Sequence, residues 1–254
     1  MDATHDLSSA RAAGRLRPIS AARLQRLLQR ARIVEQDPHG IKVAQLPSGG
    51  MLKLFRRKRR VSSAAWRPYS RRFVENAHHL QRLGIPTVEV RCHLHCRDWA
   101  RHVVAYRPLP GEVLRDRLAA GTEMDWRRLA GFVAKLHDRG VYFRSLHSGN
   151  VVCVPGGEFG LIDIADMRVS ARPLGMMRRL RNLRPLLRDP QAAPLRERVV
   201  FGTFLEAYLE AAACGAARTR LLRRLAWRRW ARFSRPRRQV GGAAAHRAAD
   251  DSRH

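Results

Sequence analysis

Three side chains in this sequence have the types and the order that chemistry on a phosphate group requires. Lys53 stands in the apolar stretch MLKLF, where its ammonium group could neutralise phosphate oxygens. Asn150 and, thirteen positions later, Asp163 carry the hard oxygen atoms that Mg²⁺ prefers as ligands. The lysine carries extra weight because only four of the fifty basic residues are lysines, and arginine serves wherever charge alone is needed. The three residues together predict a site for Mg²⁺ and a phosphorylated substrate.

The loop that ends in Asn150 reads FRSLHSGN and has the rhythm H-R-D-L-x-x-x-N of a phosphotransferase catalytic loop. Ser145 stands where that loop has its general base. A serine cannot accept a proton at neutral pH, although it can orient a substrate hydroxyl. His147 is the nearest titratable substitute, and its alternative role is to pack the loop. The sequence therefore predicts a phosphate site whose proton-handling step is altered.

The elements that must position these residues change in type half-way along the chain. Apolar spacing and turn residues first predict a helix over 21–32 capped by Ser20, a hairpin over 40–55, a helix over 70–84 capped by Ser70 and ended by Gly84, and strands over 87–96 and 101–109. The later part predicts a helix over 125–140, a hairpin around 156–157, and helices within 175–188, 196–212 and 218–233.

This order predicts an α+β protein of two lobes, in the layout of a protein-kinase-like fold. We expect a basic flexible arm over residues 1–18 and an N-lobe with a β-sheet and a helix over 19–108. A helical C-lobe with the catalytic loop and the LID motif should follow over 109–235, and a disordered tail over 236–254.

The order and spacing of Lys53, Asn150 and Asp163 resemble the protein-kinase-like superfamily over roughly residues 30–215. Within it, the stretches GIPTVEV, YRPLPG and GVYFRSLHSGN…GLIDIAD look most like bacterial lipopolysaccharide core kinases, the Kdo/heptose kinases that include toluene-tolerance proteins. SLHSGN is also similar to the DLHPGN loop of aminoglycoside and choline kinases. The resemblance implies ATP and Mg²⁺ as cofactors, with Lys53 binding ATP and Asn150 and Asp163 binding the metal. It also implies a lipopolysaccharide core, lipid A precursor or other sugar-lipid acceptor at the inner membrane.

Two departures from that family concern the nucleotide. Glu75 is the only acidic residue of the helix over 70–84, which makes it the candidate ATP-site partner of Lys53. It lies about 200° around the helix from Phe73, however, so its alternative is an exposed charge, and the family's glutamate position falls nearer Phe73. The turn DPHGIKV offers only Gly40 where a glycine-rich loop has three glycines.

The net charge of +29 favours a polyanionic partner, although arginine-rich coding from a GC-rich gene is an alternative cause. The C-terminal helix combines an apolar stripe with arginines on its other faces. The stripe comprises Leu222, Leu225, Ala226, Trp230 and Phe233. Such a helix suits an anionic inner-membrane surface, and its alternative is an ordinary packed helix. The cluster RRKRR over 56–60 could hold phosphate head groups or be a solvated loop.

The remaining sequence features concern metal binding, the cysteines, the cellular location and the alternative functions. CHLHC over 92–96 would place its cysteines and histidines on opposite faces of a strand, so it is not expected to bind zinc. The irregularly spaced cysteines suit free thiols, and the absence of a long apolar run or signal peptide indicates a cytoplasmic protein peripheral to the membrane. The functions that fit are a phosphotransferase, a catalytically impaired pseudokinase that regulates or scaffolds envelope assembly and, on charge alone, a nucleic-acid-binding protein.

Overall fold

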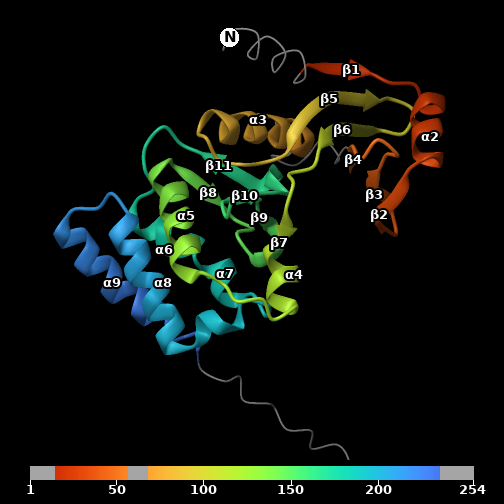
Figure 1. Cartoon of the computed structure of the whole chain (residues 1–254). Coiled ribbons are helices and arrows are strands. Elements are labelled where there is room, and N and C mark those ends of the chain that lie inside the picture. The colour runs from red at the N-terminus through yellow and green to blue at the C-terminus, as the bar shows by residue number, and fades with distance from the viewer. Residues whose placement is uncertain (1–14, 57–67, 235–254) are drawn as a thin grey trace, which may run out of the picture.

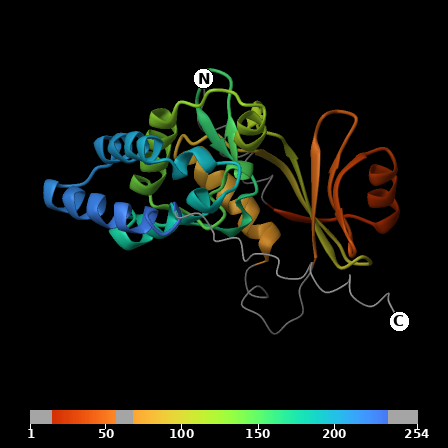
Figure 2. The same cartoon turned by 90° about the horizontal axis from the view of Figure 1, so that it is seen from below.

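The computed structural model of the chain describes residues 15–56 and 68–234. A β-rich lobe comes first and a helix-rich lobe follows, and the two lie side by side (Figures 1 and 2). The predicted α+β, two-lobed architecture, with a β-rich first lobe and a helical second lobe, is therefore confirmed. Most of the RRKRR cluster and the predicted tail over 236–254 lie outside the described residues.

The strands that the structure describes in the first lobe form one sheet, with the order β1-β5-β6-β4-β3-β2. Their bounds are β1 Leu16–Pro18, β2 Arg32–Asp37, β3 Gly40–Gln45, β4 Met51–Arg56, β5 Glu89–Cys96 and β6 Arg101–Arg107. β1 lies within the predicted flexible arm and pairs in parallel with β5, so these three residues are part of the sheet. β2 was not expected, because its side chains are mostly exposed and lack an apolar alternation.

The two faces of this sheet are covered differently. Helix α2 (Ala21–Gln29) begins after Ser20, whose side chain accepts a hydrogen bond from the Arg23 N–H at 3.3 Å, as predicted. It buries Leu24 and Leu28 against one face, on the side away from the helical lobe (Figure 2). Side chains alternate along β4, so Lys53 belongs to the opposite face. That face meets α3 (Tyr69–Arg82).

Helix α3 does not begin as predicted. Its first residue is Tyr69 and no side chain caps it, whereas Ser70 lies within the helix and is buried. The Ser70 hydroxyl is instead 2.8 Å from His102 Nδ1 on β6, a tertiary hydrogen bond that local sequence cannot reveal. The predicted end is correct, because Gly84 follows the helix with a φ of 61° that favours glycine.

The second lobe is mostly helical. Its helices are α4 Leu114–Ala119, α5 Trp126–Asp138, α6 Met176–Asn182, α7 Arg184–Arg188, α8 Arg198–Ala211 and α9 Ala216–Trp230. Its short strands are β7 Glu112–Val113, β8 Val141–Phe143, β9 Val151–Cys153, β10 Phe159–Leu161 and β11 Met167–Val169. β9 and β10 form the predicted hairpin, and β11 pairs with β8 so that Met167 lies opposite Phe143. This pairing sets the loop after β8 beside the segment after β10.

Helix α3 also contacts the second lobe. The Asn76 side-chain amide donates hydrogen bonds to the carbonyl oxygens of Ile164, at 2.6 Å, and Met167, at 3.1 Å. One hydrophobic core runs from α3 through α5 and α8. The segment that carries Asp163 is therefore held from both lobes.

A network of buried polar side chains joins α5, α6 and α8 in the second lobe. Arg179 of α6 donates to Asp138 at 2.6 Å, to the Tyr208 hydroxyl at 3.1 Å and to the Leu174 carbonyl at 2.8 Å. Tyr208 in turn lies 2.7 Å from His137 Nδ1. Burial lowers the pKa of His137 from 6.5 to about 3 and raises the pKa of Tyr208 to about 12, so both are neutral in the folded protein near pH 7.

The neutral His137 makes the fold sensitive to acid. Its pKa is lower in the folded than in the unfolded chain, so the unfolded chain binds the extra proton between about pH 6.5 and 3, and stability falls as the pH falls through 6.5. By this effect alone, stability at pH 5.5 should be about 1.4 kcal/mol lower than at pH 7.5. Urea unfolding at both pH values should show this loss in the wild type and a smaller loss in His137→Gln. Equal losses would contradict the prediction.

The C-terminal helix α9 packs into the fold. Leu222 and Ala226 are buried, the Trp230 ring stacks on Phe201 at 5.6 Å, and the Trp230 indole N–H donates to the Leu195 carbonyl. Leu222, Ala226 and Trp230 of the apolar stripe thus pack against the second lobe, while the remaining faces of α9 carry exposed arginines and the exposed Leu221.

Within the described part of the chain, no helix is long and apolar enough to cross a membrane. The same residues contain no cluster of potential metal ligands of the His, Cys, Asp or Glu type, and CHLHC lies on β5 as a plain strand. All four cysteines are free thiols, as predicted.

Candidate functional site

The centre of the candidate site is an ion pair between the lobes. Lys53 Nζ on β4 lies 2.7 Å from Asp163 Oδ1, in the turn after β10. The lysine is 17% exposed and the aspartate 53%, so the carboxylate faces an open space while the ammonium group is sheltered. Asp163 has a φ of 51°, a left-handed conformation that is uncommon for a residue other than glycine. The structure therefore brings together two of the three residues that opened the sequence analysis.

Lys53 is supported by an aromatic side chain rather than by a glutamate. Its Nζ lies 5.8 Å from the ring centroid of Phe73, close enough for a cation–π interaction. Glu75 pairs with Arg71 one turn earlier on α3, at 2.8 Å. Among the described residues, Asp163 is the only ion-pair partner of Lys53. The suggestion that Glu75 reaches Lys53 is thus corrected, and the helical angle explains why: Phe73 holds the position nearest the lysine.

Phe73 belongs to a cluster of aromatic side chains that lies beside Lys53. Its ring centroid is 5.9 Å from that of Phe55 and 5.5 Å from that of Tyr106. Burial, and then the negative charges of Asp163 and Glu35, raise the pKa of Tyr106 to about 12. The Tyr106 hydroxyl therefore stays protonated at neutral pH and can act as a hydrogen-bond donor near the carboxylates.

Asn150 lies next to the segment that carries Asp163. Its backbone carbonyl accepts a hydrogen bond from the N–H of Ile162, the residue before Asp163, at 3.1 Å. Its side-chain amide nitrogen is 2.9 Å from the Ser145 carbonyl and 3.2 Å from His147 Nε2. Since both of these contacts use the nitrogen, the amide oxygen is left as a ligand for a hard cation.

The His147 side chain contacts the Asn150 amide and not the Ser145 hydroxyl. Besides its contact with Asn150, its Nδ1 lies 3.5 Å from an Arg115 nitrogen on α4. The imidazole thus helps to orient the Asn150 side-chain amide. This placement favours the packing role over the role of a substitute base.

The Ser145 hydroxyl has a carboxylate partner that the sequence analysis did not assign to it. Ser145 Oγ donates a hydrogen bond of 2.6 Å to Asp166 Oδ2. Asp166 stands three positions after Asp163 in LIDIAD, where its expected role was to cap a turn. The sequence signal that could have revealed Asp166 is that LIDIAD has a second acidic residue. Its contact with Ser145, however, depends on the pairing of β11 with β8, which the sequence did not predict.

Two further buried side chains hold the loop from below. Asn182 Oδ1 accepts from the Phe143 N–H at 3.1 Å, and its amide nitrogen donates to the Phe143 carbonyl. Asp189 Oδ2 accepts from the Ser148 N–H at 2.6 Å. Both were missed, because an Asn and an Asp among arginines carry no distinctive local pattern. They fix the backbone on either side of Ser145.

The turn that would cover a nucleotide is tight and carries one carboxylate, Asp37. It joins β2 to β3 at His39 and Gly40, whose φ of 111° favours glycine. Asp37 Oδ1 accepts from the His39 N–H at 2.7 Å, and this hydrogen bond is the largest of the effects that lower the pKa of Asp37. Arg101 donates to the His39 carbonyl at 2.6 Å. The single glycine was predicted, and the Asp37 carboxylate in the turn lies 3.6 Å from Lys42 Nζ, which balances its charge.

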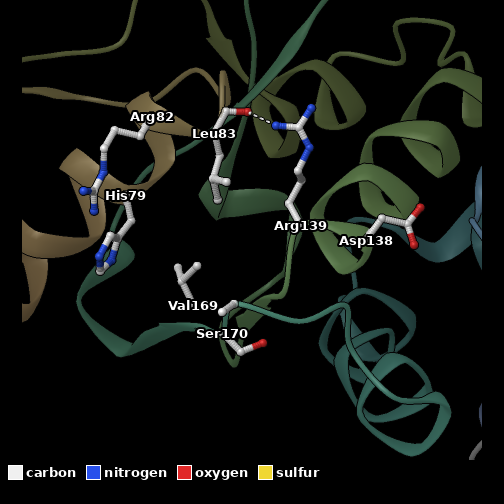
Figure 3. A pocket seen from close by; sticks show the side chains of 8 residues that line it. His79, Arg82, Leu83, Asp138, Arg139, Val169 and Ser170 are labelled. Carbon is white, nitrogen blue, oxygen red and sulfur yellow. Dashed lines mark hydrogen bonds between the residues drawn. The ribbon is translucent and has the colours of Figure 1, made fainter.

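An open cavity of about 430 Å³ lies elsewhere, between the C-terminal ends of α3 and α5 (Figure 3). Its wall combines apolar residues with Arg82, Asp138 and Arg139, and Arg139 donates to the Leu83 carbonyl at 2.9 Å. None of the predicted site residues lines it. The cavity is therefore separate from the Lys53–Asp163 site.

The chain matches solved structures but no sequence family. No protein-family model matches it, and neither does any curated protein. A structure of the bifunctional kinase-methyltransferase WbdD is 18% identical over 74% of this chain and 46% of that one, with a TM-score of 0.38. A high-resolution crystal structure of WbdD is 17% identical over 76% and 50%, with a TM-score of 0.39. The chain spans half or less of the length of these proteins, and similarity at this level adds nothing to the geometry of the site.

The arrangement fits Mg²⁺ and a phosphate group. An exposed carboxylate at Asp163 and an amide oxygen at Asn150 are the donor types that Mg²⁺ takes, and the metal would keep several waters besides. Lys53 supplies a sheltered positive charge at the same place. What the arrangement can do chemically is hold a metal-bound phosphate between the two lobes.

Proposed function

We propose that the chain is an ATP-dependent phosphotransferase of the kinase-like fold, with an alcohol group as the acceptor. The observation that carries the proposal is the ion pair of Lys53 with Asp163, placed beside Asn150 and above the loop of Ser145. Phosphoryl transfer depends mainly on positioning and on neutralisation of charge, and these residues supply both.

The roles follow from the geometry. Lys53 would hold the phosphates of ATP, and Asn150 and Asp163 would hold Mg²⁺. Bound Mg²⁺ supplies charge neutralisation at the phosphoryl group. The chain itself contributes a loop fixed by Asn182 and Asp189, so that Ser145 can orient the acceptor hydroxyl in one place.

The acceptor that we propose is a sugar of the lipopolysaccharide core, a lipid A precursor or another sugar-lipid. This rests on the resemblance of the GLIDIAD and YRPLPG stretches and on the basic surface. The exposed arginines of α9 include Arg218, Arg220, Arg224 and Arg228, and Arg232 follows the helix. Burial and then the charges of Arg184, Arg232 and Arg181 lower the pKa of Arg229, a sign that cations gather where α6, α7 and α9 meet. An anionic membrane surface would relieve that repulsion.

A pseudokinase that regulates or scaffolds envelope assembly is the second candidate. Two features favour it: the Phe73 ring lies beside Lys53 where the resemblance leads us to expect a glutamate, and the turn after β2 offers only Gly40 where a glycine-rich loop has three glycines. Both would weaken nucleotide binding. Nucleic-acid binding has support from charge alone.

Thermal unfolding with Mg·ATP tests the nucleotide site. At a concentration of one hundred times its Kd, Mg·ATP should stabilise the wild type by about 2.7 kcal/mol, which raises Tm by roughly 5–10 °C for a chain of this size. Lys53→Ala and Asp163→Ala should each abolish this ligand-induced shift, because they remove the phosphate and metal contacts.

Glu75→Gln is the matched control, since Glu75 pairs with Arg71 and should leave the shift unchanged. A wild type that Mg·ATP does not stabilise would overturn the nucleotide site. Catalysis is then measured as the phosphate content of lipopolysaccharide in a strain that lacks the gene. A lower content supports the phosphotransferase, whereas an unchanged content leaves only the regulatory function.

A further inference from the structure

We propose that Asp166 supplies the basic group that the loop lacks, with Ser145 passing the proton to it. This assignment rests on the proposed phosphotransferase function. The acceptor hydroxyl would give its proton to Ser145 Oγ while the Ser145 proton moves to Asp166 Oδ2. The carboxylate that related loops carry at position 145 is thus moved to the segment after β10.

The hydrogen bond between the two side chains has the geometry that such a transfer needs. The distance from Ser145 Oγ to Asp166 Oδ2 is 2.6 Å, within the range of an O–H group bonded to a carboxylate. Because an ionised carboxylate can only accept, the serine must donate its hydrogen. The Ser145 oxygen therefore keeps its lone pairs for a substrate hydroxyl.

Both partners are held in place by bonds from other elements. The Ser145 backbone carbonyl accepts from Asn150, and Asn182 fixes Phe143 two residues earlier. On the other side, Asn76 binds the carbonyls of Ile164 and Met167, which flank Asp166. A pair fixed from both lobes meets the requirement that a catalytic geometry be set before the substrate arrives.

The other oxygen of Asp166 is not explained by a structural role. Oδ1 is buried and has no hydrogen-bond partner among the residues that the structure describes. Buried polar atoms are nearly always bonded, and an exception in a native structure calls for an explanation. A carboxylate that only capped a turn would bond to backbone N–H groups. The hydrogen bond of Asp166 goes to the Ser145 hydroxyl instead, which suits a group that receives a proton during turnover.

The transfer balances in atoms and charge. The acceptor oxygen forms a bond to the γ-phosphorus of ATP, the bond from that phosphorus to the bridging oxygen breaks, and ADP leaves. The proton of the acceptor hydroxyl goes to Ser145 Oγ, and the Ser145 proton goes to Asp166, which later releases it to water. General base catalysis of this kind typically contributes about 10²–10⁴-fold in rate.

The test measures transfer of the γ-phosphate of ATP to lipopolysaccharide extracted from the deletion strain. Asp166→Asn and Ser145→Ala should each lower kcat by about 10²–10⁴-fold, and the double variant should lose no more than either single one. Each should keep the Tm shift with Mg·ATP, because neither residue binds the nucleotide. Glu158→Gln, which removes an exposed carboxylate from the β9–β10 turn, should leave kcat unchanged.

An exchange variant guards against loss by misfolding. Ser145→Asp combined with Asp166→Asn returns the carboxylate to the loop and keeps a hydrogen bond, so it should recover kcat to within about tenfold of the wild type. Transfer by Asp166→Asn within threefold of the wild type would overturn the assignment. So would a Ser145→Ala variant that transfers normally, or an exchange variant that folds and stays inactive. A wild type that binds Mg·ATP but transfers nothing would overturn the proposed function itself, before any Asp166 variant is compared.

Discussion

Replacing Phe73 with alanine is expected to lower the free energy of unfolding by about 3–5 kcal/mol. The side chain is 1% exposed and packs between Phe55 and Tyr106, so its removal leaves a cavity that the two rings cannot fill. The same cavity opens below Lys53, whose ammonium group lies over the ring. The change should therefore weaken Mg·ATP stabilisation as well as the fold.

Urea unfolding at pH 7.5 measures the first effect, with the midpoint expected to fall and the slope to stay constant. Arg71→Ala, two positions earlier on α3, is the control, because its exposed ion pair with Glu75 is worth at most about 1 kcal/mol. Phe73→Leu should lie between the two. A loss below about 1 kcal/mol for Phe73→Ala would show that the ring does not support the site.

The aromatic cluster of Phe55, Phe73 and Tyr106 bears on the choice between an active phosphotransferase and a pseudokinase. A glutamate at the Phe73 position would compete with Asp163 for Lys53, whereas the ring leaves the ammonium group paired with the carboxylate. To bind phosphate, Lys53 must then either release Asp163 or contact Asp163 and the phosphate of a metal-bound nucleotide at the same time. Mg²⁺ on Asp163 would make the exchange favourable, so binding should depend strongly on the metal.

The sequence could predict the parts of this fold that depend on local spacing. The helix of α5 and the hairpin of β9 and β10 follow from apolar periodicity and from Gly156-Gly157. The 100° step of a helix also indicated that Glu75, although it was the candidate partner of Lys53, lies about 200° around α3 from Phe73. These inferences needed only residues within one or two turns of each other.

What could not be predicted depends on contacts between distant segments. Ser70 looks like a helix cap until His102 of β6 lies beside it. Asp166 meets Ser145 only because β11 pairs with β8, and nothing in either strand specifies that pairing. The apolar stripe of α9 could face a membrane or pack inside the protein, and only the contacts with Phe201 and the Leu195 carbonyl show that Trp230 packs inside.

Replacing Arg179 with methionine is the second change with a large expected effect. The guanidinium group is 3% exposed and pairs with Asp138, which is 21% exposed. Without it, the Asp138 carboxylate keeps the Ala213 N–H as its one donor among the described residues, and the buried Tyr208 hydroxyl loses a donor too. Breaking a buried pair from one side costs about 3–5 kcal/mol, so Tm should fall by roughly 6–20 °C.

Arg178→Met provides the control, because Arg178 is the exposed neighbour on the same helix. Its Tm should stay within about 2 °C of the wild type. Arg179 joins α5, α6 and α8 and does not contact Lys53. Mg·ATP should therefore still raise the Tm of the Arg179→Met protein. A loss of that stabilisation in a folded Arg179→Met protein would mean that the network under the second lobe controls the site, and not only the stability of the fold.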